Sequence, residues 1–142
     1  MSVYHKVLVV LDLSSEAKQV LDRASSLKAD ELHLLHVVEP LITETPYDLA
    51  PVVSIEVEQA IIERAENFLA ALKKDCGVEK SNASVRIGSI KGEILQAAEE
   101  LDADLIVVGT HGRHGLGLLL GSVANAVLHG TPCDVLAVRI GK

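Results

Sequence analysis

Short apolar runs alternate along the chain with longer segments in which apolar residues recur every three or four positions. The runs cover residues 5–11, 32–38, 83–87, 105–108 and 135–140. Most are rich in Val, Leu and Ile, and residues 5–11 form a nearly continuous apolar run, which is typical of parallel strands buried on both faces. Helical spacing is found between them, at residues 17–27, 54–74, 91–101 and 122–129. Each strand is therefore predicted to be joined to the next by a helix.

This alternation predicts a single α/β domain over residues 1–142, with an open, doubly wound parallel sheet and helices on both faces. No helix follows the last strand, at residues 135–140, so its edge is uncovered in the prediction. An apolar strand edge is an aggregation hazard unless a partner pairs with it. We therefore expect a homodimer in which this strand pairs with its twin.

The composition narrows the functions that such a domain can serve. Aliphatic residues must form the core, because 49% of the 142 residues are hydrophobic and only 2% are aromatic. The 13 basic and 20 acidic residues give a net charge of −7, which disfavours nucleic-acid binding because no basic groove or stacking platform is indicated.

No apolar run approaches the roughly 18 residues of a membrane span. Since its start lacks a signal-peptide pattern, the chain is expected to be cytoplasmic.

The main candidate for chemistry is the glycine-rich stretch between the fourth strand and the last helix. Residues 109–122 include Gly109, Gly112, Gly121 and Ser122, directly after a buried strand. Glycines permit turns with positive φ and close approach of the main chain to a ligand. The first N–H groups of a helix lack internal partners and carry the positive end of its dipole, so this junction can bind phosphate or another anion. A glycine-rich turn without a ligand is the alternative interpretation.

Three polar side chains near this loop have both a binding and a structural interpretation. Asp12 follows the first strand, which in such a sheet adjoins the fourth, so its carboxylate can accept hydrogen bonds from the ribose or base of a nucleotide. Its structural alternative is a helix cap or a bond to the neighbouring loop. Arg113 either neutralises phosphate charge or is solvated, and Ser122 caps the last helix or contacts phosphate. Neither a P-loop motif nor a metal-ligand spacing is present.

Five segments together resemble the universal stress protein family. They are residues 6–14, 34–38, 104–112, 121–122 and 132–138. The resemblance covers essentially the whole chain and implies a Rossmann-like sheet with strand order 3-2-1-4-5, together with a homodimer formed through the last strand. It also implies a division between members that bind ATP and members that do not.

The ATP-binding members carry the pattern G-x-x-G, nine residues, then G-[ST]. Here Gly109 and Gly112 match the first part and Gly121 and Ser122 the last, but only the eight residues 113–120 lie between them. This deletion shortens the arch over the phosphates. The non-binding branch tends to lose the glycines themselves, and this sequence keeps them, so ATP binding is favoured.

The resemblance implies a role for each matching residue. Asp12 and Val37 would contact the adenosine part of the nucleotide, with Val10 and Val108 lining its pocket. The residues implied around the ribose and phosphates are Gly109, Gly112, Arg113, Gly121, Ser122 and Val123. Mg²⁺ would accompany the ATP, bound mostly through phosphate oxygens and water.

Three functional hypotheses follow for the sequence. The first is an ATP-binding regulatory module of the stress response that acts on an unknown protein partner. The second is a dimeric interaction protein that binds no nucleotide and whose loop glycines are only structural. The third, a slow ATPase or autophosphorylating enzyme with Ser122 or Thr110 as the acceptor, ranks last because the sequence places no general base near an attacking water.

Overall fold

Strands and helices alternate strictly in the computed structural model, which describes residues 3–40, 55–110 and 122–140. The elements are β1 (Lys6–Val10), α1 (Ala17–Ser25), β2 (Glu31–Val38), α2 (Ile55–Asp75), β3 (Asn82–Ile87), α3 (Ile90–Leu101), β4 (Leu105–Gly109), α4 (Ser122–Leu128) and β5 (Asp134–Val138). Every predicted strand and helix is present within a few residues of its expected bounds.

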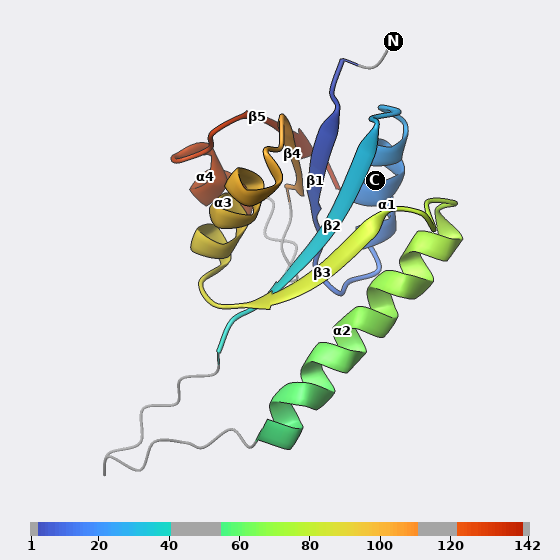
Figure 1. The fold of residues 1–142 in the computed structure, drawn as a ribbon, viewed down its shortest axis with the longest axis vertical. Coiled ribbons are helices and arrows are strands. Elements are labelled where there is room, and N and C mark those ends of the chain that lie inside the picture. The colour runs from blue at the N-terminus through green and yellow to red at the C-terminus, as the bar shows by residue number, and fades with distance from the viewer. Residues whose placement is uncertain (1–2, 41–54, 111–121, 141–142) are drawn as a thin grey trace.

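The strands form one five-stranded sheet in the order β3-β2-β1-β4-β5 (Figure 1). All four neighbouring pairs are parallel. The chain moves outward from β1 to β3, returns to the other side of β1 with β4, and ends at the edge with β5. This topology confirms the predicted doubly wound α/β fold with strand order 3-2-1-4-5.

Helices cover both faces of the sheet. α1 and α2 pack on one face, over an apolar cluster that includes Val9 and Val107. α3 and α4 pack on the other, over a cluster that includes Leu8 and Ile106. Because neighbouring strand residues point to opposite faces, the near-continuous apolar runs supply both clusters at once. In β4, Leu105–Val108 are each at most 2% exposed, as expected for a strand buried on both faces.

β5 and α1 each end two residues before the predicted position. β5 ends at Val138, so Ile140 lies beyond the strand, yet it is only 6% exposed and belongs to the cluster under α1 and α2. Because Ile140 is apolar and buried like the strand residues, the apolar run continues past Val138, and the predicted strand was too long. α1 begins at Ala17, as predicted, but ends at Ser25, and its N-cap residue Glu16 makes no side-chain capping bond.

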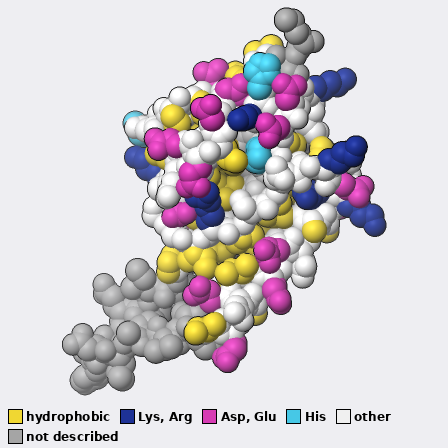
Figure 2. All heavy atoms as spheres, viewed as in Figure 1, with side chains coloured by type: hydrophobic (Ala, Val, Ile, Leu, Met, Phe, Trp, Pro, Cys, Tyr) yellow, Lys and Arg dark blue, Asp and Glu magenta, His cyan; other side chains and the backbone are white. Residues whose placement is uncertain are grey.

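The start of α2 carries exposed apolar side chains. Ile55 is 75% and Val57 50% exposed, and Figure 2 shows apolar side chains on this face between the helix and the sheet.

Among the described residues, no helix combines the length and apolar character that crossing a bilayer requires.

Candidate functional site

The predicted site lies where β1 and β4 end side by side at the middle of the sheet. These two strands pair in parallel, and the connection after β1 leads to α1 on one face whereas α4, which follows β4, packs on the other (Figure 1). Because the chain departs to opposite sides, the carboxyl ends of the two strands flank a topological switch point. Open parallel sheets bind their ligands at such points.

Four predicted valines contribute to the apolar cluster on one face of the sheet. Val37 and Val108 are 7% and 1% exposed and belong to the apolar cluster under α3 and α4. Val10 and Val123 are half-buried and pack against the same cluster. The valines come from β2, β4, β1 and α4, so the fold gathers in space residues that lie far apart in the sequence.

Asp12 lies in the turn after β1 and is half-buried. Its Oδ1 accepts hydrogen bonds from the Ser14 N–H at 3.2 Å and the Ser14 hydroxyl at 2.5 Å. The Ser14 hydroxyl oxygen in turn accepts from the Glu16 N–H at 3.3 Å. Asp12 therefore stabilises its own turn and does not cap α1, whose N-cap residue is Glu16. Within the described ranges its Oδ2 has no partner.

His36 contacts this turn, and its contribution was not anticipated from the sequence. Its Nδ1 lies 2.8 Å from the carbonyl oxygen of Leu11, the residue before Asp12. Strand register could have indicated this contact. Val10 pairs with Leu35, so His36, the next residue of β2, lies beside Leu11 at the end of β1.

Gly109 ends β4 and has a packing role. A β-carbon at this position would overlap Cδ1 of Ile140. The next residue, Thr110, donates its N–H to the Val138 carbonyl at 2.9 Å. Ser122 begins α4. The remaining predicted loop residues, Gly112, Arg113 and Gly121, lie outside the described residues.

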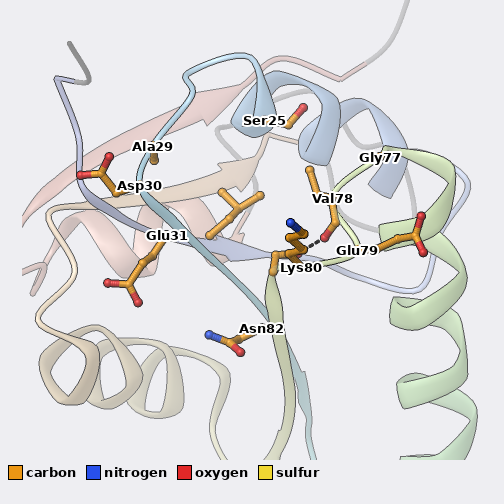
Figure 3. Close-up of a pocket in the computed structure, with 11 residues that line it drawn as sticks. Ser25, Ala29, Asp30, Glu31, Gly77, Val78, Glu79, Lys80 and Asn82 are labelled. Carbon is orange, nitrogen blue, oxygen red and sulfur yellow. Dashed lines mark hydrogen bonds between the residues drawn. The ribbon is translucent and has the colours of Figure 1, made fainter.

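A pocket lies at the opposite, amino-terminal edge of the sheet (Figure 3). It has a volume of about 580 Å³ and is lined by residues including Ser25, Asp30, Glu31, Glu79 and Lys80. Three carboxylates against one ammonium group make it unfavourable for phosphate. None of the predicted nucleotide residues lines it.

The chain is thus an open, doubly wound α/β protein, and the predicted residues Val10, Asp12 and Val108 lie at the carboxyl ends of its two central strands or just beyond them. The model of the universal stress protein family matches residues 3–139, and the chain belongs to this family. Universal stress protein A homolog 2 of Coxiella burnetii is 39% identical over 145 residues, covering 99% of this chain and 98% of that protein.

Solved structures agree with this assignment. Universal stress protein UspA from Lactobacillus plantarum has a TM-score of 0.80 at 26% identity, covering 96% of this chain and 98% of its own. A universal stress protein in complex with cAMP has a TM-score of 0.60 at 28% identity, covering 95% of this chain and 96% of its own. The predicted family is therefore confirmed, and one structural relative holds a nucleotide.

Proposed function

We propose that this universal stress protein binds an adenine nucleotide, ATP with accompanying Mg²⁺, and acts as a cytoplasmic, homodimeric regulatory module. The observation that carries the proposal is that Val10, Val37 and Val108 belong to one apolar cluster near the carboxyl ends of their strands, while Asp12 follows directly after β1 and Leu11. An apolar wall suits the faces of a purine, and a carboxylate oxygen that has no partner among the described residues suits a ribose hydroxyl or a base N–H. The relative in complex with cAMP adds support for this ligand class.

The phosphates occupy the loop side of the site in this proposal. Gly109, Gly112 and Gly121 let the main chain approach them, Arg113 supplies a positive charge, and Ser122 and Val123 contribute from the start of α4. The described ranges hold no group of three or more His, Cys, Asp or Glu side chains that could bind a metal ion. Mg²⁺ is therefore assigned to phosphate oxygens and water.

Titration calorimetry with MgATP tests the binding site. We expect saturable heat from the wild type, none from Gly112→Val, and roughly 10- to 100-fold weaker binding for Asp12→Asn, because one charge-assisted hydrogen bond is lost. Asp12→Asn keeps an Oδ1 to accept from Ser14. The matched control is Asp30→Asn, which makes the same chemical change at the opposite edge of the sheet and leaves the affinity unchanged.

Two results would refute the assignment. Negligible heat from wild type and Gly112→Val alike removes nucleotide binding altogether. Equal weakening by Asp12→Asn and Asp30→Asn indicates a general disturbance of the fold and not the loss of a specific carboxylate contact.

A second candidate function is a dimeric interaction protein that takes no nucleotide. It is favoured by Gly109, whose missing side chain is explained by contact with Ile140 and needs no ligand. Nucleotide released from freshly purified, acid-denatured protein discriminates the two candidates and identifies the nucleotide. The second candidate predicts none, and also predicts no rise in Tm at millimolar ATP, ADP, AMP or cAMP.

The proposed dimer forms through the edge of β5. The Val138 carbonyl is directed toward Thr110 on the β4 side, and backbone groups alternate along a strand, so those of Ala137 point to the open edge. Ala137→Pro then removes an outward N–H without breaking the β4–β5 ladder. We expect a dimer for the wild type and a monomer for Ala137→Pro in sedimentation velocity. An unchanged dimer in the variant rules out pairing through this edge.

A further inference from the structure

His36 holds the main chain at the point where β1 ends. Its Nδ1 is 2.8 Å from the carbonyl oxygen of Leu11, while the Leu11 N–H donates to the Leu35 carbonyl at 2.9 Å. Both backbone groups of Leu11 are therefore bound by β2, although β1 itself ends at Val10. A carbonyl oxygen only accepts, so Nδ1 carries the hydrogen of this bond, whether the ring is neutral or cationic.

This bond bears directly on Asp12, the next residue. Because a peptide unit is planar, holding the Leu11 carbonyl also orients the Asp12 N–H in the same unit. From the other side, Oδ1 of Asp12 is held by the Ser14 N–H at 3.2 Å. The Asp12 carboxylate is thus oriented in two ways: the bond to the Leu11 carbonyl fixes its main chain, and the bond from Ser14 fixes its Oδ1. Within the described ranges its Oδ2 is without a partner.

His36 does not lie on the same face of the sheet as the predicted valines. Val37 belongs to the cluster under α3 and α4, and neighbouring side chains of a strand point to opposite faces. The imidazole therefore lies on the face covered by α1 and α2. Its contact with the site passes through the Leu11 carbonyl.

We propose that His36 is a positioning residue of the nucleotide site: its bond to the Leu11 carbonyl directs the Asp12 carboxylate toward the ribose or base. The proposal rests on the nucleotide-binding function above. One part of it, the effect of His36 on the turn that holds Asp12, is independent of any ligand, and this part separates the two proposals experimentally.

Two substitutions of His36 separate the effect of its hydrogen bond from the effect of its side-chain volume. His36→Asn puts an amide Nδ2 where the imidazole has Nδ1, so the donor is retained. His36→Leu keeps a side chain of similar bulk without a donor. In nucleotide-free protein, we expect His36→Leu to speed hydrogen exchange of the Ser14 amide relative to that of Ile106, and His36→Asn to restore the wild-type rate.

The affinity for MgATP provides the second measurement. We expect His36→Leu to weaken binding roughly 3- to 10-fold, the value of one ordinary hydrogen bond, and His36→Asn to bind nearly as the wild type does. In an Asp12→Ala background, His36→Leu should produce no further loss, because no carboxylate remains to be directed.

Each result decides a proposal. Additive losses in the double variant, equal losses in both His36 variants, or an unchanged Ser14 exchange rate in His36→Leu would overturn the positioning role. If the wild type binds no nucleotide but His36→Leu speeds Ser14 exchange and His36→Asn restores it, the proposed function fails. The effect of His36 on the Asp12 turn then stands.

Discussion

Ile140 packs directly against the main chain of Gly109. A β-carbon at position 109 would overlap Cδ1 of Ile140 and lie 3.2 Å from Cγ2 of Val20. Gly109 ends β4, and Ile140 follows β5 and is 6% exposed. The first glycine of the loop motif is thus required by contacts with α1 and with the end of the chain, whatever the loop binds.

We expect Gly109→Ala to lower the free energy of unfolding by about 1–3 kcal/mol, because an added methyl group overpacks a closed contact. Urea unfolding of nucleotide-free protein measures this loss. Ile140→Ala removes the opposing side chain, so the double variant should lose less than the sum of the two single losses. An unchanged free energy for Gly109→Ala would contradict the packing explanation.

Thr110 ties the end of β4 to the segment after β5. Its hydroxyl oxygen accepts from the Ile140 N–H at 3.3 Å, and its own N–H donates to the Val138 carbonyl. We expect Thr110→Val to lose about 1 kcal/mol of stability, since the shape is kept and one hydrogen bond is lost. Thr110→Ser, which retains the hydroxyl, should keep more of that stability. If both variants lose the same amount, the hydroxyl contact is not the cause.

Asp104 anchors the start of β1 from the neighbouring strand segment. Its two carboxylate oxygens accept from the N–H groups of His5 at 2.8 Å and Lys6 at 3.0 Å. Partial burial by itself would raise the pKa of Asp104, but these amide donors outweigh it and lower the pKa below 3.8. The ionised carboxylate is therefore favoured in the folded protein.

The sign of the pH dependence follows from this lowered pKa. The contribution of Asp104 is fully present above the unfolded-state pKa, near 4, and is lost as the pH falls through the lower folded-state pKa. We expect Asp104→Asn to cost about 1–2 kcal/mol at pH 7. The gap to the wild type should narrow below about pH 4 in urea unfolding at several pH values. A gap that stays constant or widens on acidification would contradict this account.

The local sequence pattern predicted the strands and helices, and it placed several candidate-site residues on them, because both depend on short-range regularities. The face on which Val10, Val37 and Val108 meet follows from strand alternation once the sheet order is assumed. Asp12 was identifiable because it follows the first strand. The hydrogen bonds of that carboxylate, however, depend on the geometry of the turn, which residue types alone do not determine.

The contacts missed from the sequence join segments that are distant in the chain. The bond from His36 to Leu11 spans 25 positions and depends on strand register. The contact between Gly109 and Ile140 depends on where β5 ends. An apolar residue has the same sequence signature inside a strand and just beyond it, so residues 135–140 were predicted as strand although β5 is Asp134–Val138.

Cys76, just after α2, is expected to be a poorly reactive thiol. Burial, followed by a hydrogen bond to the Asp22 carboxylate and its negative charge, raises the pKa of Cys76 from 9.0 to about 11. A rise of this size lowers the thiolate fraction at pH 8 roughly 100-fold, and the thiolate is the reactive form. The reaction of Cys76 with an aromatic disulfide reagent can be followed at pH 8 in the Cys133→Ser variant. It should be slow in the folded protein and fast in protein unfolded by urea. Asp22→Asn, which removes the carboxylate charge, should accelerate the folded-state reaction, and equal rates for folded and unfolded protein would contradict the assignment.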